Sequence, residues 1–151
     1  MKPQFIIKPH KGIGPIQLGM TRKEVKSVLG ENNYSGSSGN SDYFFNNSIQ
    51  VEYERGKADF IGATYSDYYV ISYKGVNVFD TSSEELFDLI AAGENNAHSY
   101  NSCEYLFPDQ IVTLWDADEQ YDHIGNETRT VWAQIGTGSK NYLEAVSRTN
   151  V

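Results

Sequence analysis

The chain is poor in cysteine, in positive charge and in long hydrophobic runs. Its one cysteine, Cys103, excludes an internal disulfide bond and is compatible with a reducing compartment. Twelve Lys and Arg against twenty Asp and Glu leave a formal net charge of −8, which disfavours contact with phosphate backbones and anionic lipid. The apolar run over residues 5–7 is too short for a signal peptide, and no stretch is long enough for a membrane-spanning helix. We therefore expect a cytoplasmic protein that binds neither nucleic acid nor membrane.

The size and composition that remain are those of a folded globular chain. The length of 151 residues with 39% hydrophobic residues is enough to build one core, and we expect a single domain over residues 1–151. The acidity is compatible with a basic protein partner, with a cation, or with solubility alone.

Two short segments carry the signals of helices. Thr21 and Glu24 form a capping-box pattern, and Gly30 is placed to end the helix that follows. The second helix is expected to begin after 82–83, where two serines precede two glutamates, and to end at Gly93. The apolar residues expected to bury these segments are Leu18, Val25, Val28, Leu29, Leu86, Leu89 and Ile90.

Most other segments have the alternation of strands. Apolar and polar residues alternate over 49–54, and Arg55-Gly56-Lys57 predicts a hairpin turn into a strand over 58–65. Nine of the ten residues over 32–41 are Asn, Ser or Gly, which predicts a loop. Further strands are expected over 68–73, 104–107, 110–115 and 130–135. The pattern indicates an α+β fold, in which a twisted antiparallel sheet carries both short helices on one face.

The segments that precede the two helices are similar to each other. Each reads apolar, polar, apolar and then reaches a threonine, Thr21 in the first and Thr81 in the second, at an offset of 60 residues. A duplication would give two helix-plus-strand units over about 12–73 and 74–146. Coincidence between two capped helices is the alternative.

No group of residues has the spacing of a catalytic or metal site. The histidines and Cys103 are too far apart in sequence for a zinc motif. The segment 116–123 is acidic, but Tyr121 stands where a calcium loop of the EF-hand type needs glycine, so a solvated loop is the simpler interpretation. We therefore expect no enzymatic activity, no small-molecule substrate, no cofactor and no metal.

The surface residues most typical of a protein interface are tyrosines and carboxylates. Tyr65 and Tyr68 flank Asp67, and tyrosine gives a large contact area at small entropic cost. Burial of these tyrosines in the core, and plain solvation of the polar face of strand 49–54, are the alternatives. An acidic wall results if the 116–122 loop folds over the sheet. The predicted partner-binding residues are Glu52, Glu54, Tyr65, Asp67, Tyr68, Asp116, Asp118, Glu119 and Asp122.

Several short motifs resemble known families. Gly14–Val25, with Leu-Gly-Met-Thr before Glu-Val, resembles the opening motif of the SmpA/BamE-like lipoprotein domain. The doubled helix-plus-strand plan resembles the β-lactamase inhibitor protein fold, whose sheet grips its enzyme.

More of the chain resembles small cytosolic bacterial proteins encoded beside polymorphic or contact-dependent toxins. The matching segments are 56–61, 73–80, 112–115 and 135–136. This resemblance implies an immunity protein that covers the active site of a cognate toxin domain, with a basic nuclease as the expected toxin. The alternatives are a structural or assembly module of the SmpA/BamE-like kind, and a small hydrolase that uses the 116–123 segment.

Overall fold

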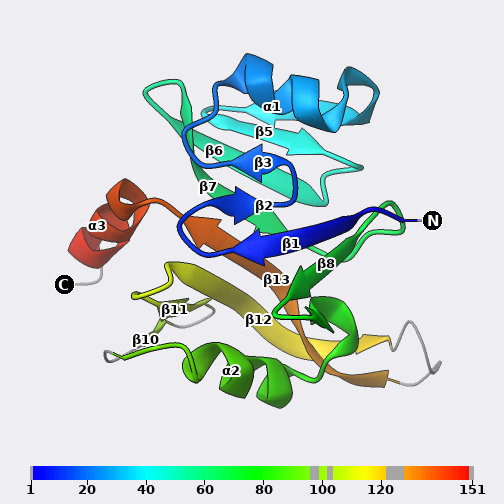
Figure 1. Cartoon of the computed structure of the whole chain (residues 1–151), viewed down its shortest axis with the longest axis vertical. Helices are drawn as coiled ribbons and strands as arrows, with labels where there is room; N and C mark the ends of the chain where they lie inside the picture. The colour runs from blue at the N-terminus through cyan, green and yellow to red at the C-terminus, as the bar shows by residue number, and fades with distance from the viewer. Residues whose placement is uncertain (1, 96–98, 102–103, 122–127, 150–151) are drawn as a thin grey trace.

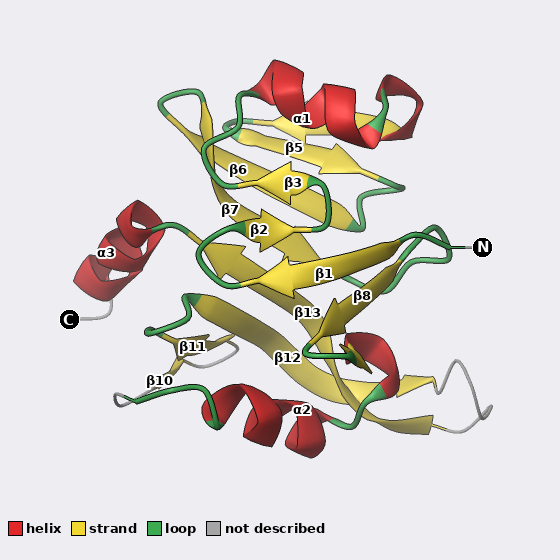
Figure 2. Ribbon diagram, viewed as in Figure 1, coloured by secondary structure: helices red, strands yellow, loops and turns green. Residues whose placement is uncertain are grey.

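The computed structural model describes residues 2–95, 99–101, 104–121 and 128–149, and it has the predicted α+β class. Its strands form two sheets (Figures 1 and 2). The long sheet has the order β10-β11-β12-β13-β7-β6-β5-β4, and the small sheet has the order β3-β2-β1-β8-β9. The strands of the long sheet are β4 (Tyr34–Ser38), β5 (Ser41–Phe44), β6 (Ile49–Glu54), β7 (Lys57–Ala63), β10 (Ser99–Asn101), β11 (Glu104–Phe107), β12 (Val112–Tyr121) and β13 (Thr128–Gly138). Those of the small sheet are β1 (Gln4–Lys8), β2 (Gly12–Ile13), β3 (Ile16–Gln17), β8 (Val70–Tyr73) and β9 (Val76–Asn77).

The small sheet departs from the expected single antiparallel sheet. β1 pairs with β8 in parallel, with Phe5 opposite Ile71. A parallel pair needs a long crossover between its strands, and here the whole segment from β2 to β7 supplies it. The expectation that all strands are antiparallel holds for the long sheet and is wrong for this pair.

The predicted helix signals place α1 (Arg22–Leu29) and α2 (Ser83–Ala91) correctly. In α1 the backbone N–H of Glu24 donates to Thr21 Oγ1 at 3.2 Å, and the Glu24 carboxylate accepts from the Thr21 backbone at 3.2 Å. In α2 the Ser82 hydroxyl accepts from the N–H of Glu85 at 3.3 Å. The chain also has two 3₁₀ turns, η1 (Glu31–Asn33) and η2 (Val78–Asp80). A third helix, α3 (Lys140–Thr149), was not predicted from the sequence patterns.

One hydrophobic core lies on the inner face of the long sheet. The small sheet, α1 and α2 cover this inner face together (Figure 1). Val25 and Leu29 of α1 are buried there, and so are Leu86 and Ile90 of α2, which confirms that both helices pack on one face. The remaining expected core residues differ: Val28 is 42% exposed, and Leu18 and Leu89 are only partly buried.

Two expected loops are strands. Of the loop expected over 32–41, residues 34–38 form β4 and Ser41 begins β5. β5 pairs with the edge of β6, and β4 pairs with β5, so these polar residues are extended in spite of their low β-propensity. Residues 116–121 extend β12, whose partner β13 continues beside it, with Asp118 opposite Val131. In both places the pairing partner, which lies elsewhere in the sequence, decides the structure.

The two halves of the chain repeat one arrangement. The hairpin β2–β3 pairs Ile13 with Ile16, and the hairpin β8–β9 pairs Tyr73 with Val76, the same register 60 residues later. Each hairpin precedes a helix and four antiparallel strands, β4–β7 and β10–β13. This arrangement is what a duplication would produce, and the duplication itself stays a prediction.

Two valines of α1 offer a matched test of the core. We expect Val25→Ala to lower the free energy of unfolding by about 2 kcal/mol, because two buried methyl groups are lost and a cavity remains. Val28→Ala, on the exposed side of the same helix, is expected to change it by less than about 0.5 kcal/mol. Urea denaturation measures both, and equal effects would show that the helix is packed on a different side.

Candidate functional site: a groove on the outer face of the long sheet

The outer face of the long sheet carries an open groove of about 620 Å³. On β6 the core residues Ile49 and Val51 alternate with outward Gln50 and Glu52, which are half-buried. Strands β7, β12 and β13 and helix α3 supply the other walls. The lining residues are Gln50, Glu52, Phe60, Thr64, Trp115, Ala133, Gln134 and Tyr142.

Glycines in β7 and β13 make the space for the aromatic walls. Gly62 of β7 pairs with Gly136 of β13 at the centre of the sheet. A Cβ on Gly136 would overlap the Phe60 ring, and a Cβ on Gly138 would overlap the Tyr142 ring. The rings therefore lie directly against the backbone of β13, and a side chain at Gly136 or Gly138 would displace them.

A bulge in β7 anchors α3 beside this groove. The pairing of β6 with β7 shifts register between Glu52 and Tyr53, so that Asp59 is the extra residue. The Asp59 carboxylate accepts from the Ser139 hydroxyl and, at 3.4 Å, from the Asn141 amide. Because an acid at a helix N-terminus is favourable, Asp59 fixes the start of α3.

The anchored helix completes the aromatic wall. The Ser139 hydroxyl accepts from the backbone N–H of Tyr142 at 3.1 Å, as the cap of α3. The Tyr142 ring then stacks on Phe60, with 4.6 Å between the centroids and 26° between the planes. Trp115 of β12, which is 40% exposed, stands on another side of the groove.

Glu52 is the charged residue of the groove. Burial, and then repulsion from Asp59, raise the pKa of its carboxyl. Among the described residues, none forms a hydrogen bond or an ion pair with the Glu52 carboxylate. A second hollow, of about 360 Å³, shares Glu52 and Tyr142 with the groove and reaches Glu54 and Asp59. The groove therefore presents uncompensated negative charge beside aromatic rings.

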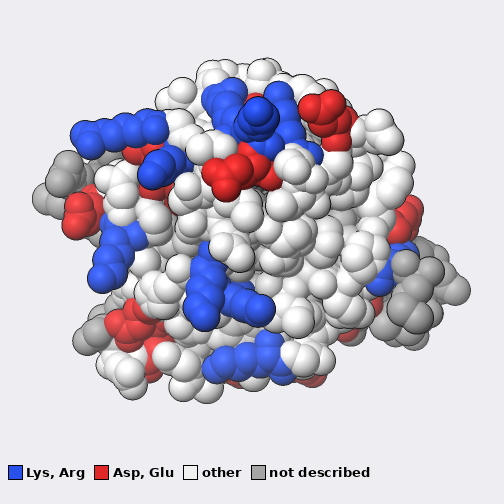
Figure 3. Space-filling model, turned by 45° about the horizontal axis from the view of Figure 1, so that its top comes forward, with Lys and Arg blue, Asp and Glu red and all other residues white. Residues whose placement is uncertain are grey.

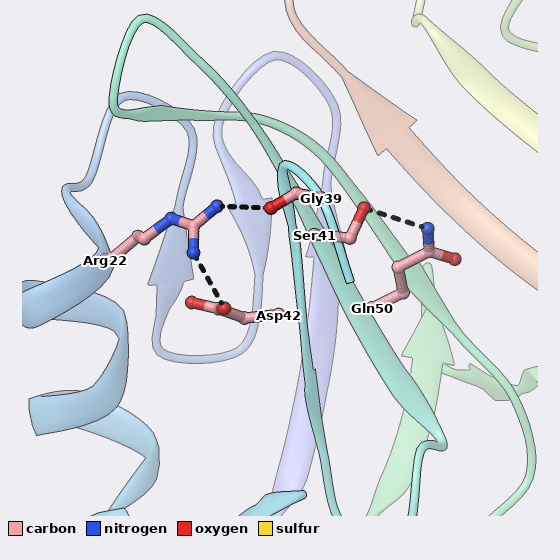
Figure 4. A network of polar contacts seen from close by, with 5 residues as sticks. All are labelled: Arg22, Gly39, Ser41, Asp42 and Gln50. Atoms are coloured by element: carbon pink, nitrogen blue, oxygen red, sulfur yellow. Dashed lines mark hydrogen bonds and ion pairs between the residues drawn. The ribbon is translucent and has the colours of Figure 1, made fainter. Parts of the chain in front are cut away.

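The inner side of the same strands is closed by an ion pair (Figure 4). Arg22 of α1 donates to Asp42 Oδ1 at 3.2 Å and to the Gly39 carbonyl oxygen at 3.1 Å. Its guanidinium lies over the Tyr53 ring, 4.9 Å from the centroid. Burial, and then the Asp42 carboxylate, raise the pKa of Tyr53. This contact ties α1 to the β4–β5 turn, while on the outer side Gln50 donates to the Ser41 hydroxyl at 3.4 Å.

The tyrosines predicted for the interface form a separate cluster. The Tyr65 hydroxyl donates to Asp67 Oδ1 at 2.8 Å, and Tyr68 is 54% exposed with its ring 5.7 Å from that of Phe45. These residues, which we call the Tyr65 cluster, surround a hollow of about 460 Å³ beyond the end of β7.

The structure thus divides the predicted partner-binding set. Glu52 lines the outer groove, Glu54 lines the adjoining second hollow, and Tyr65, Asp67 and Tyr68 lie in the Tyr65 cluster. Asp116, Asp118 and Glu119 are on β12 instead of a loop, so the proposed folding of 116–121 over the sheet is wrong. Asp122 lies outside the described residues, and so does Cys103.

The aromatic walls of the groove were missed by sequence reasoning. Phe60 and Trp115 each neighbour a core residue, Ile61 or Leu114, and therefore point outward on their strands. The signal that could have found them is the glycine content of 136–138 inside a strand pattern, since glycine in a strand often marks close approach by other atoms.

The described part of the chain contains no group of three His, Cys, Asp or Glu side chains arranged to hold a metal ion. None of the helices within it has the length and apolar character needed to cross a membrane. No protein-family model, no curated protein and no solved structure matches the chain.

The packing of Phe60 on β13 can be tested through Gly136. We expect Gly136→Ala to lower the free energy of unfolding by about 1–3 kcal/mol, because the added methyl group overlaps the ring. Gly62→Ala should cost less, since its methyl group meets the flexible amide of Gln134.

A double-mutant cycle separates this overlap from a general loss of strand flexibility. Phe60→Leu removes the ring, so the cost of Gly136→Ala should fall by at least about 0.5 kcal/mol in that background. Additive costs in urea denaturation would mean that the ring and the glycine are not coupled.

The buried Tyr69 predicts sensitivity to alkali. Its hydroxyl lies 2.7 Å from Ser48 Oγ and 2.9 Å from the Thr64 carbonyl oxygen, and burial raises the pKa of Tyr69 to about 12. Between pH 10 and 12 the unfolded chain therefore loses this proton before the folded chain does, and stability falls as the pH rises. Urea midpoints over this range should fall less steeply in Tyr69→Phe. An unchanged slope would assign the alkaline loss to other groups.

Proposed function

We propose that this protein is an immunity protein, which neutralises a cognate toxin domain by seating a basic part of it in the outer groove. The observation that carries this proposal is the groove itself: an open, aromatic-lined hollow that contains a half-buried carboxylate without a partner among the described residues. Aromatic anchors with complementary charge are what tight protein interfaces use.

The distribution of charge supports this choice of face. Lys and Arg side chains gather on the side that carries α1, where Arg22, Lys23 and Lys26 are neighbours (Figure 3). Glu24 lies between them and Arg22 is paired with Asp42, so this side is mixed in charge and less favourable for a basic partner than a purely acidic surface. The outer groove, with Glu52 and the adjoining Glu54 and Asp59, is the complementary surface. A basic nuclease domain is the class of toxin that this charge favours.

The motif that suggested an assembly module has a local structural role. Gly19 has a φ of 92°, and backbone hydrogen bonds join Gly19 and Met20 to Ala58 at 2.8 and 2.7 Å. Thr21 then caps α1. Because these residues start the helix and attach it to β7, their pattern does not itself favour an assembly role.

The test is to co-express the toxin domain encoded beside this protein with each variant, and to measure protection of the cell and binding rates. Trp115→Ala should weaken binding about thirtyfold, mainly through faster dissociation, because a central aromatic anchor contributes about 2 kcal/mol. Ile6→Ala is the matched control, since Ile6 is 47% exposed on β1 of the small sheet. Full protection by Trp115→Ala would contradict the proposal.

The same assay distinguishes the Tyr65 cluster and the acidic residues. If the Tyr65 cluster is part of the interface, Tyr68→Ala should also speed dissociation, by a similar factor. Replacing Asp116, Asp118, Glu119 and Asp122 together by neutral residues should lower the rate of association with the toxin domain. Added salt should lower the association rate of the unmodified protein in the same way. If the association rate is unchanged by both the neutralisation and the added salt, the acidity serves solubility and does not steer binding.

A further inference from the structure

Glu52 is half of an ion pair whose other half is missing from the described chain. It is half-buried, and none of the described residues supplies a cation to it. A carboxylate taken partly out of water is unfavourable until a cation or several donors compensate it. Its neighbour Asp59 adds to this cost instead of relieving it.

The other side of the same strands shows how this chain completes such a pair. There the Arg22 guanidinium bonds Asp42 of β5 and lies over the Tyr53 ring of β6. A carboxylate and an aromatic ring on adjacent strands thus accommodate one arginine; Figure 4 shows its ion pair with Asp42. In the outer groove, Glu52 of β6 lies opposite Phe60 of β7 in the strand register, so a carboxylate and an aromatic ring again occupy adjacent strands, with no arginine paired to Glu52 among the described side chains.

The remaining walls fit a guanidinium better than an ammonium. The Tyr142 ring, which stacks on buried Phe60, and the exposed Trp115 ring give a flat cation aromatic surfaces to lie on. The amides of Gln50 and Gln134 add hydrogen-bond acceptors beside Glu52. A guanidinium has five donors in one plane, whereas the ammonium of lysine is a compact, strongly hydrated charge.

We propose that the outer groove binds an arginine side chain, whose guanidinium pairs with Glu52 and stacks on the aromatic walls. The identification of the arginine as one presented by a toxin domain rests on the proposed function, but the chemistry of the groove does not. For a basic toxin, capture of an arginine both orients the complex and removes a phosphate-binding charge from its surface.

The experiment uses three capped tripeptides, Gly-X-Gly, in which X is arginine, citrulline or lysine. Citrulline keeps the shape of arginine without its charge. Each peptide is titrated to about 50 mM at constant ionic strength, because one side chain is expected to bind with a dissociation constant of a few millimolar. The indole N–H signal of Trp115 in NMR spectra reports the groove. The buried indole of Trp132, which donates to the Ser83 carbonyl oxygen at 3.0 Å, reports the fold.

We expect the arginine peptide to shift the Trp115 signal with saturation, the lysine peptide to bind at least threefold more weakly, and the citrulline peptide not to saturate. Glu52→Gln should weaken arginine binding at least tenfold while the Trp132 signal stays in place. Glu84→Gln is the matched control, because Glu84 is an exposed acid in the first turn of α2. Equal binding of arginine and citrulline, or unchanged binding by Glu52→Gln, would overturn the inference.

The outcomes for the groove and for the toxin are separable. Arginine binding without any effect of Trp115→Ala on toxin neutralisation would keep this inference and reject the proposed function of the groove. Loss of neutralisation in Trp115→Ala without arginine binding would do the reverse.

Discussion

The pairing of β7 with β13 is the contact on which the architecture depends. It joins the four strands β4–β7 to the four strands β10–β13 and so makes one sheet from two halves of the chain. On the inner side, Ile61 and Ile135 of these strands are fully buried in the core. On the outer side, the paired Gly62 and Gly136 have no side chains to fill the surface, which leaves a depression there. The pairing of β7 with β13 therefore supplies both the centre of the core and the floor of the groove.

The groove stays open because the fold covers the two faces of this sheet unequally. The small sheet, α1 and α2 all pack on the inner face, where the hydrophobic core is. Of the helices in the described ranges, only α3 reaches the outer side, through the contacts of Asp59 with its first turn and of Tyr142 with Phe60. One helix at one end shapes the groove without filling it. This aromatic and acidic surface, left uncovered, is the structural difference from an α+β sandwich whose sheet is covered on both faces.

Local chemistry determined the elements that sequence analysis could predict. The capping box at Thr21 and the hairpin turn at Arg55-Gly56, where φ is 54° and 77°, depend on neighbouring residues alone. The strand character of 34–38 depends on β5, and the stacking of Phe60 on Tyr142 joins residues 82 positions apart in sequence. Of the predicted site, Glu52 was found because alternation assigns it to the polar face. The aromatic rings beside it were not found, because no local pattern shows which outward residues a distant helix will cover.

The polar strand β4 has a consequence for how the molecule meets others. It lies at one edge of the long sheet, where free backbone groups invite another chain to add a strand. Its sequence over Tyr34–Ser38 is rich in serine and glycine, and the register slips between Tyr34 and Gly36. An irregular edge with so little apolar surface is a poor template for strand addition, so it protects the protein from sheet-to-sheet aggregation at high concentration. Partners at this edge are thereby discouraged, and recognition is left to side chains on the faces of the sheet.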